Sequence, residues 1–160
     1  MISSLPRRTT GERAPATPGP APGGIAQRRS ILLVDDNPDF GDVLAQILRG
    51  EGHAVEVARD GWAALDLVRR FHPAFALLDL GLPRMDGFEL ARRMKLEQAA
   101  GEPVLVALTG FAEPSHTRRA REVGFVQLLV KPFELPRLLA ILQRGPAGAG
   151  APAGRPATRG

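Results

Sequence analysis

Between residues 30 and 144, the chain alternates five times between a short apolar run and a longer segment with helical spacing of apolar positions. Most of the short runs are continuous and rich in branched aliphatic side chains, which is typical of strands buried on both faces of a sheet. Each run therefore predicts a strand. The predicted strands cover residues 31–34, 53–58, 75–78, 104–108 and 125–130.

A predicted helix follows each predicted strand. In the first helix, Asn37 and Pro38 are expected to be the N-cap and the first helical residue, and Gly50 and Gly52 to end the helix. Its apolar positions recur at helical spacing and predict one face packed on a sheet, formed by Phe40, Val43, Leu44, Ile47 and Leu48. The later helices are expected over about residues 60–70, 88–98 and 115–122, followed by a last helix with Leu135, Leu138, Leu139 and Leu142 on one face.

This order of elements predicts the fold class. Five strand–helix units joined by short loops make the strands parallel, because each helix acts as a right-handed crossover. The expected architecture is a three-layer α/β sandwich formed by residues 30–144. In an open parallel sheet of this kind, ligands bind beyond the carboxyl ends of the strands.

Polar residues stand at the carboxyl ends of four of the five predicted strands. They are Asp35 and Asp36 after the first strand, Asp79 after the third, Thr109 after the fourth and Lys131 after the fifth. Three carboxylates at one edge repel one another unless a cation or a proton intervenes. Oxygen ligands without His or Cys suit Mg²⁺. With a lysine and a hydroxyl beside them, these groups predict a carboxylate that accepts a phosphoryl group.

Each of these residues alone also has an ordinary structural explanation. Either aspartate of the first pair can simply cap the following helix, while Thr109 can belong to a turn and Lys131 can be a solvated charge. The end of the second strand, at Ala58 and Arg59, adds no comparable group. The shared position of the other residues at successive strand ends favours a site.

Four stretches of the central segment resemble the receiver domain of two-component response regulators. They are ILLVDDNPDF at 31–40, LLDLGLPRMDGFELARRM at 77–94, VALTGF at 106–111 and LVKPFEL at 129–135. The resemblance implies a flavodoxin-like, doubly wound, five-stranded parallel sheet with strand order 2-1-3-4-5. It also implies a phosphoacceptor signalling protein rather than an enzyme, with a sensor histidine kinase or a histidine phosphotransfer protein as the phosphoryl donor. The third and fourth of these stretches look like those of receivers attached to hybrid sensor kinases, which favours a relay.

The resemblance assigns roles to the residues at the strand ends. Asp79 is the implied phosphoacceptor, and Thr109 and Lys131 are implied to contact the phosphoryl group. Mg²⁺ is the implied cofactor, with Asp36 and Asp79 as direct ligands, Asp35 as a ligand through water and Gly81 as a ligand through its backbone carbonyl. The Lys131–Pro132 peptide bond is implied to be cis.

Two positions bear on how such a protein would signal. The family has an aromatic switch residue three positions before the lysine, where this chain has Leu128. The alternative function is therefore a phosphorylation-independent interaction module with a receiver fold. Phe111 corresponds to a position that tunes phosphoryl lifetime in the family, and we expect it to shield the acyl phosphate from water. A phosphohydrolase with an aspartate nucleophile would need a second acid where Gly81 stands.

The two ends of the chain differ in composition from the central segment. The net charge of +4 arises there, because residues 1–29 hold five arginines against one glutamate and residues 145–160 hold two arginines. Both ends are rich in Pro and Gly, so residues 1–29 and 145–160 are expected to be disordered tails. The short C-terminal segment predicts no output domain, and hence signalling through contacts with a separate downstream protein.

Composition also excludes several classes of function. The chain has no Cys, which removes disulfides and thiolate metal sites and favours a cytoplasmic location. No apolar run reaches the roughly 20 residues that span a bilayer. Scattered arginines without aromatic residues predict neither nucleic-acid nor membrane binding. The three histidines are interpreted as surface residues and Trp62 as a half-exposed packing residue.

Overall fold

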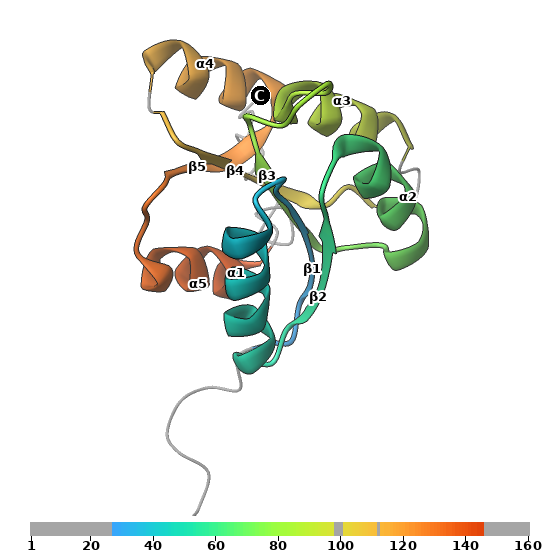
Figure 1. The fold of residues 1–160 in the computed structure, drawn as a ribbon, viewed down its shortest axis with the longest axis vertical. Coiled ribbons are helices and arrows are strands. Elements are labelled where there is room, and N and C mark those ends of the chain that lie inside the picture. Colours follow the sequence, from blue (N-terminus) through green and yellow to red (C-terminus); the bar gives the residue numbers. More distant parts are fainter. Residues whose placement is uncertain (1–26, 98–100, 112, 146–160) are drawn as a thin grey trace, which may run out of the picture.

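The computed structural model describes residues 27–97, 101–111 and 113–145, which form alternating strands and helices (Figure 1). The strands are β1 (Ser30–Val34), β2 (Ala54–Ala58), β3 (Phe75–Asp79), β4 (Val104–Thr109) and β5 (Phe125–Val130). The helices are α1 (Pro38–Gly50), α2 (Gly61–Phe71), α3 (Gly87–Glu97), α4 (Pro114–Val123) and α5 (Leu135–Arg144). All ten elements expected from the sequence are present, and the predicted bounds differ from the observed ones by no more than one residue.

The five strands form one sheet in the order β2-β1-β3-β4-β5, and every neighbouring pair is parallel. This is the flavodoxin-like order that the family resemblance implied. The direction of winding reverses between β1 and β3, so a crevice opens beyond the carboxyl ends of these two strands. The fold thus brings the residues that follow β1 next to the residue that ends β3.

The sheet lies between two layers of helices, with α1 and α5 on one face and α2, α3 and α4 on the other (Figure 1). Successive side chains of β1 point to opposite faces of the sheet. Ile31 and Leu33 pack with α1 and α5, whereas Leu32 and Val34 pack with the opposite layer. All four side chains are completely buried, which confirms the prediction of a strand buried on both faces.

The predicted buried face of α1 is partly wrong. Leu44 and Leu48 are buried as expected, but Val43 is 58% exposed and Ile47 is 38% exposed. The helix turns Ala45 toward the sheet instead, and Ala45 is completely buried. Val43 and Ile47 both line a cavity of about 350 Å³ beside the start of α5, so the apolar spacing extends beyond the part of α1 that packs on the sheet.

Local signals in the sequence fix the start of α1. The Asn37 side chain caps the helix by accepting hydrogen bonds from the backbone N–H groups of Asp39, at 3.0 Å, and Phe40, at 3.3 Å. Pro38 begins the helix, where its missing N–H group costs no hydrogen bond. The cap therefore sets where the chain turns from the end of β1 into the helix.

Most of the two predicted tails, residues 1–26 and 146–160, lies outside the described residues. Arg29, just before β1, donates from Nε to the Leu142 carbonyl at 3.3 Å and from its backbone N–H to His53 Nδ1 at 3.2 Å. His53 is only 7% exposed, so its interpretation as a surface residue is wrong. Trp62 is 56% exposed, as expected for a half-exposed residue. Within the described part of the chain, no helix is long and apolar enough to cross a bilayer.

Candidate functional site

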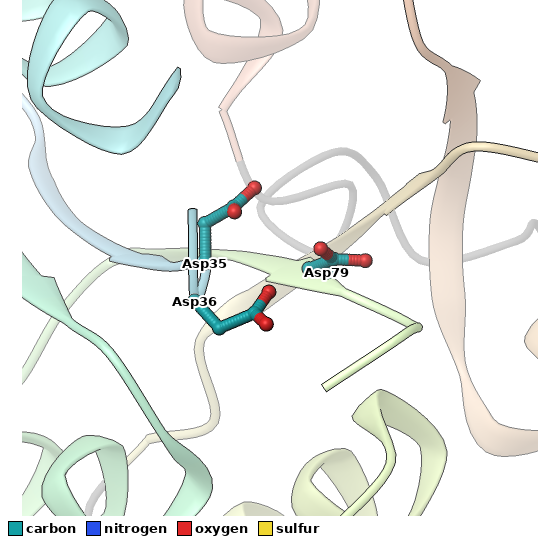
Figure 2. Close-up of side chains that lie close together, drawn as sticks. All are labelled: Asp35, Asp36 and Asp79. Atoms are coloured by element: carbon teal, nitrogen blue, oxygen red, sulfur yellow. The ribbon is translucent and has the colours of Figure 1, made fainter. Parts of the chain in front are cut away.

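Three aspartates meet at the carboxyl end of the sheet (Figure 2). Asp35 and Asp36 directly follow β1, and Asp79 is the last residue of the neighbouring strand β3. One carboxylate oxygen from each lies within 4.8 Å of the others. Asp35 is completely buried, Asp79 is half-buried and Asp36 is exposed, so the cluster opens to solvent on the Asp36 side.

Lys131 joins two of these carboxylates from the end of β5. Its Nζ lies 2.5 Å from Asp35 Oδ2 and 3.2 Å from Asp79 Oδ2. The same ammonium lies 4.3 Å from the centre of the Phe40 ring, which favours a cation over its face. The Lys131 backbone N–H donates to the Thr109 carbonyl at 2.7 Å. The Lys131–Pro132 peptide bond is cis, as the resemblance implied.

Backbone N–H groups hold the remaining oxygens of the two inner carboxylates. Asp35 Oδ1 accepts from the Asn37 N–H at 2.9 Å, and Asp79 Oδ1 accepts from the Gly81 N–H at 2.8 Å. Each carboxylate thus has one oxygen on the backbone and the other on Lys131. This arrangement fixes the orientation of both carboxylates.

Gly87 allows the start of α3 to approach the end of β3 closely. A Cβ at this position would lie 2.5 Å from the Asp79 carbonyl oxygen and 2.9 Å from the Leu80 Cα. Both neighbours are backbone atoms that cannot turn aside, so only glycine fits. Gly87 directly precedes the helix expected over about residues 88–98, but the backbone contact that requires glycine there is visible only in the structure.

Thr109 ends β4 with its side chain 5% exposed, and its hydroxyl is bonded to its own loop. Oγ1 donates to the Phe111 carbonyl at 2.9 Å and accepts from the Phe111 N–H at 3.1 Å. A cavity of about 230 Å³ lies beside Asp79 and is lined in part by Gly81, Thr109 and Phe111. The structure therefore brings Thr109 to the same edge as Asp79, with its hydroxyl facing the loop.

Arg59, which the sequence interpretation left without a role, lies next to the aspartates. It follows β2, and β2 neighbours β1 in the sheet. Its Nη1 lies 3.4 Å from the Asp35 carbonyl oxygen and 3.3 Å from the Asn37 carbonyl oxygen. Strand order was the signal that could have found it, because the end of β2 adjoins the end of β1 only in the order 2-1-3.

The donor set fits a hard divalent cation. All three side chains offer carboxylate oxygens, and the exposed position of Asp36 leaves room for the water ligands that Mg²⁺ retains. Lys131 offsets part of the negative charge, and two of the three carboxylates share it. The cluster is therefore suited to a cation that takes one or two carboxylates directly.

Comparison with known proteins agrees with the geometry of this site. Residues 31–143 match the response regulator receiver domain. The chain belongs to this family. Receiver domains are phosphoacceptor signalling domains of two-component systems, and they typically bind Mg²⁺ at an acidic pocket.

Two curated relatives illustrate the range of proteins that contain this domain. The chain is 38% identical over 115 residues to the "Uncharacterized 14.6 kDa protein in sodA1 3'region" of Leptolyngbya boryana, covering 71% of this chain and 87% of that protein. It is 37% identical over 113 residues to the DNA-binding response regulator MtrA of Mycolicibacterium smegmatis, covering 71% of this chain. The match spans about half of MtrA, namely 48% of its length.

A solved structure shows the same fold. The chemotaxis protein CheY4 of Vibrio cholerae superimposes on the receiver domain with a TM-score of 0.69 and 29% sequence identity. The match covers 74% of this chain and 98% of CheY4. Almost the whole of CheY4 therefore corresponds to the domain described above.

Proposed function

We propose that this receiver domain accepts a phosphoryl group on Asp79 from the phosphohistidine of a sensor histidine kinase or of a histidine phosphotransfer protein. The phosphorylated domain then signals through contacts with a downstream protein. The observation that carries this proposal is the position of Lys131, whose ammonium bridges Asp79 and Asp35 within a cluster of three carboxylates. A phosphoryl group on Asp79 would find a cation already beside it.

The proposed reaction transfers a phosphoryl group between two protein side chains. An Asp79 carboxylate oxygen attacks the phosphorus, forming an acyl phosphate, and the phosphorus–nitrogen bond of the donor breaks. The electron pair of that bond stays on the imidazole nitrogen of the donor. Because Lys131 Nζ lies 3.2 Å from Asp79 Oδ2, it can move to an oxygen of the transferring group and stabilise its charge.

The three aspartates provide the Mg²⁺ site of this proposal. Asp36 and Asp79 would bind the ion directly, Asp35 would bind it through water, and Gly81 would contribute its backbone carbonyl. The chemistry that Mg²⁺ supplies there, when bound, is neutralisation of charge on the oxygens of the transferring phosphoryl group. The close carboxylates support this assignment, because their mutual repulsion favours a cation between them.

Thr109 would respond to the new charge. Its hydroxyl is bonded to the Phe111 backbone, and it would leave that partner to donate to a phosphoryl oxygen. Gly110 has no Cβ, and one added there would meet no atom within 4 Å, so the loop has space to move. Exchange of one hydrogen-bond partner for a charged one would shift the domain toward a second conformation.

A second candidate function is a phosphorylation-independent interaction module. It is favoured by Leu128, which is partly buried and packs against the core cluster between the sheet and helices α2, α3 and α4. Such an aliphatic side chain has no ring to exchange between buried and exposed positions. Under this alternative, the acidic pocket would persist but would not be used for phosphorylation.

Acetyl phosphate with Mg²⁺, followed by measurement of intact mass, tests the proposal. We expect the wild-type chain to gain the mass of one phosphoryl group and Asp79→Asn to gain none. Asp66→Asn is the matched control, because it removes a carboxylate from the exposed face of α2. It should be phosphorylated like the wild type.

The other outcomes separate the alternatives. No mass gain in the wild type would contradict the proposal and favour the interaction module. A mass gain that persists in Asp79→Asn would place the phosphoryl group on another residue. Multiple turnover of a phosphoester would indicate a phosphohydrolase, which the absence of an acid at Gly81 disfavours.

A further inference from the structure

The guanidinium of Arg59 connects the end of β2 to the start of α1, two elements that lie side by side (Figure 1). Nη1 lies 3.4 Å from the Asp35 carbonyl oxygen and 3.3 Å from the Asn37 carbonyl oxygen. Nη2 forms an ion pair with the Asp42 carboxylate in the first turns of α1. One planar group thus contacts three residues of the segment 35–42, which runs from the end of β1 into α1.

The two carbonyls contacted by Nη1 flank Asp36. Asp36 is exposed, so the position of its carboxylate depends mainly on how firmly the backbone on either side is held. On one side, the Asp35 backbone N–H also donates to the Ala58 carbonyl at 3.1 Å. On the other side, the Asn37 carbonyl accepts the Gly41 N–H of the first helical turn, at 3.0 Å. Arg59 links these two points directly, because its Nη1 contacts both the Asp35 and the Asn37 carbonyl oxygens.

Gly41 supplies the space that the guanidinium occupies. A Cβ at this position would overlap Arg59 Nη1 and would lie 3.8 Å from the Asp35 Cβ. Glycine is disfavoured inside helices, so its presence in the first turns of α1 has a steric reason here. The group that would be displaced by a larger residue is the flexible end of Arg59, whereas the helix backbone could remain in place.

We propose that Arg59 is a positioning residue for the Mg²⁺ site, which acts by fixing the backbone of residues 35–37. This inference rests on the proposed function, because it assumes that Asp36 binds the ion. Groups that orient metal ligands without touching the metal typically contribute about tenfold to a hundredfold in metal affinity. Arg59 suits this role because its planar guanidinium can contact several oxygens at once.

The positive charge of Arg59 weakens Mg²⁺ binding, whereas its positioning of Asp36 strengthens it. The direction in which Mg²⁺ affinity changes when Arg59 is removed therefore tests the proposal. A nearby positive charge repels Mg²⁺, so removing a guanidinium that acted only as a charge would tighten Mg²⁺ binding. Removing a guanidinium that positions Asp36 would weaken it. The pairing of Arg59 with Asp42 reduces the repulsion, so the positioning effect should dominate.

The experiment is a Mg²⁺ titration of the full chain, followed through the backbone amide NMR signals of Asn37 and Gly81. We expect Arg59→Ala to raise the Mg²⁺ dissociation constant by about tenfold. Gly41→Ala should raise it similarly, because it displaces the guanidinium while keeping its charge. The double variant should bind Mg²⁺ no more weakly than Arg59→Ala alone, since both changes remove the same contact.

Arg49→Ala is the matched control. Arg49 also joins α1 to β2, donating from Nη2 to the Val55 carbonyl at 2.7 Å, but at the far end of the helix from the aspartates. It should leave Mg²⁺ affinity unchanged even where it lowers stability. An unchanged or lower Mg²⁺ dissociation constant in Arg59→Ala would overturn the positioning role of Arg59 but not the metal site. So would a double variant whose dissociation constant rises by the product of the two single effects. No Mg²⁺-dependent change in the wild type would overturn both this role and the proposed metal site.

Discussion

Thr109 and Phe111 are joined by two hydrogen bonds through one hydroxyl, which donates to the Phe111 carbonyl and accepts from the Phe111 N–H. In this conformation, the Thr109 hydroxyl holds its own loop rather than reaching toward Asp79. These two bonds stabilise the observed conformation of the loop after β4. A phosphoryl group on Asp79 would stabilise a second conformation, in which the Thr109 hydroxyl donates to it.

This relationship predicts that Thr109→Ala separates phosphorylation from the response to it. The variant should still gain one phosphoryl mass from acetyl phosphate, because Asp79 and Lys131 are intact. It should lose the changes in the amide NMR signals of α4 and β5 that beryllofluoride, a phosphoryl mimic, is expected to cause in the wild type. Thr109→Ser keeps the hydroxyl and should retain them. Equal spectral changes in Thr109→Ala and the wild type would contradict the prediction.

Phe111 should lengthen the lifetime of the phosphoryl group. Its ring is 75% exposed, and the residue lines the cavity beside Asp79, where it can limit the approach of water to an acyl phosphate. We expect Phe111→Ala to shorten the half-life of phosphorylated Asp79 by about threefold, because water exclusion suppresses hydrolysis. Loss of radiolabel over time measures the half-life. An equal or longer half-life in the variant would remove this role.

Asp36→Asn should raise stability in the absence of Mg²⁺. Three carboxylates lie close together but Lys131 pairs with only two of them, so removal of the Asp36 charge leaves both Lys131 ion pairs in place. Relief of repulsion should raise Tm by about 3 °C in EDTA, the size expected for a modest gain in a domain of this length. Mg²⁺ should stabilise the wild type more than the variant. A lower Tm for Asp36→Asn in EDTA, with Asp66→Asn unchanged, would show that repulsion is not significant.

The sequence was sufficient for the layers of the fold and for the residues at the strand ends. Asp35, Asp79 and Lys131 could be grouped because parallel strands place their carboxyl ends at one edge, and the structure brings these three side chains together. Their roles in phosphorylation stay predictions. Arg59 was missed because two of its contacts are to backbone carbonyls and its ion pair with Asp42 joins residues 17 positions apart, and neither kind of contact leaves a pattern in the sequence.

Burial was the least predictable property, since it depends on which neighbours cover a residue. Val43 has helical spacing suited to a core position, yet it lines a cavity between α1 and the start of α5 and is 58% exposed. His53 looked like a surface residue at the start of a strand. It is buried because Arg29, a residue assigned to a tail, packs beside it and donates to its ring.

The burial of His53 predicts a dependence of stability on pH. Burial lowers the pKa of His53 below its ordinary value of 6.5, and the nearby positive charge of Arg29 acts in the same direction, whereas Glu51 opposes them. Protonation would also remove the Nδ1 lone pair that accepts the Arg29 N–H. The unfolded chain therefore binds a proton more readily than the folded one. The stability that the neutral His53 ring contributes is fully present above pH 6.5. It is lost as the pH falls from 6.5 toward the lower pKa of His53 in the folded protein.

Thermal unfolding of the wild type and of His53→Asn at two pH values measures this effect. Asparagine can still accept a hydrogen bond but does not titrate, so the stability of the variant should be less sensitive to acid. The variant should be less stable at neutral pH because it loses the packing of the buried ring. Between about pH 7.5 and pH 5.5, the wild type should lose about 3 °C more in Tm than the variant. His72→Gln, which replaces an exposed histidine, should follow the wild type. If His53→Asn loses as much Tm as the wild type, acid sensitivity arises elsewhere, because the only titrating group removed is the buried ring that accepts from Arg29.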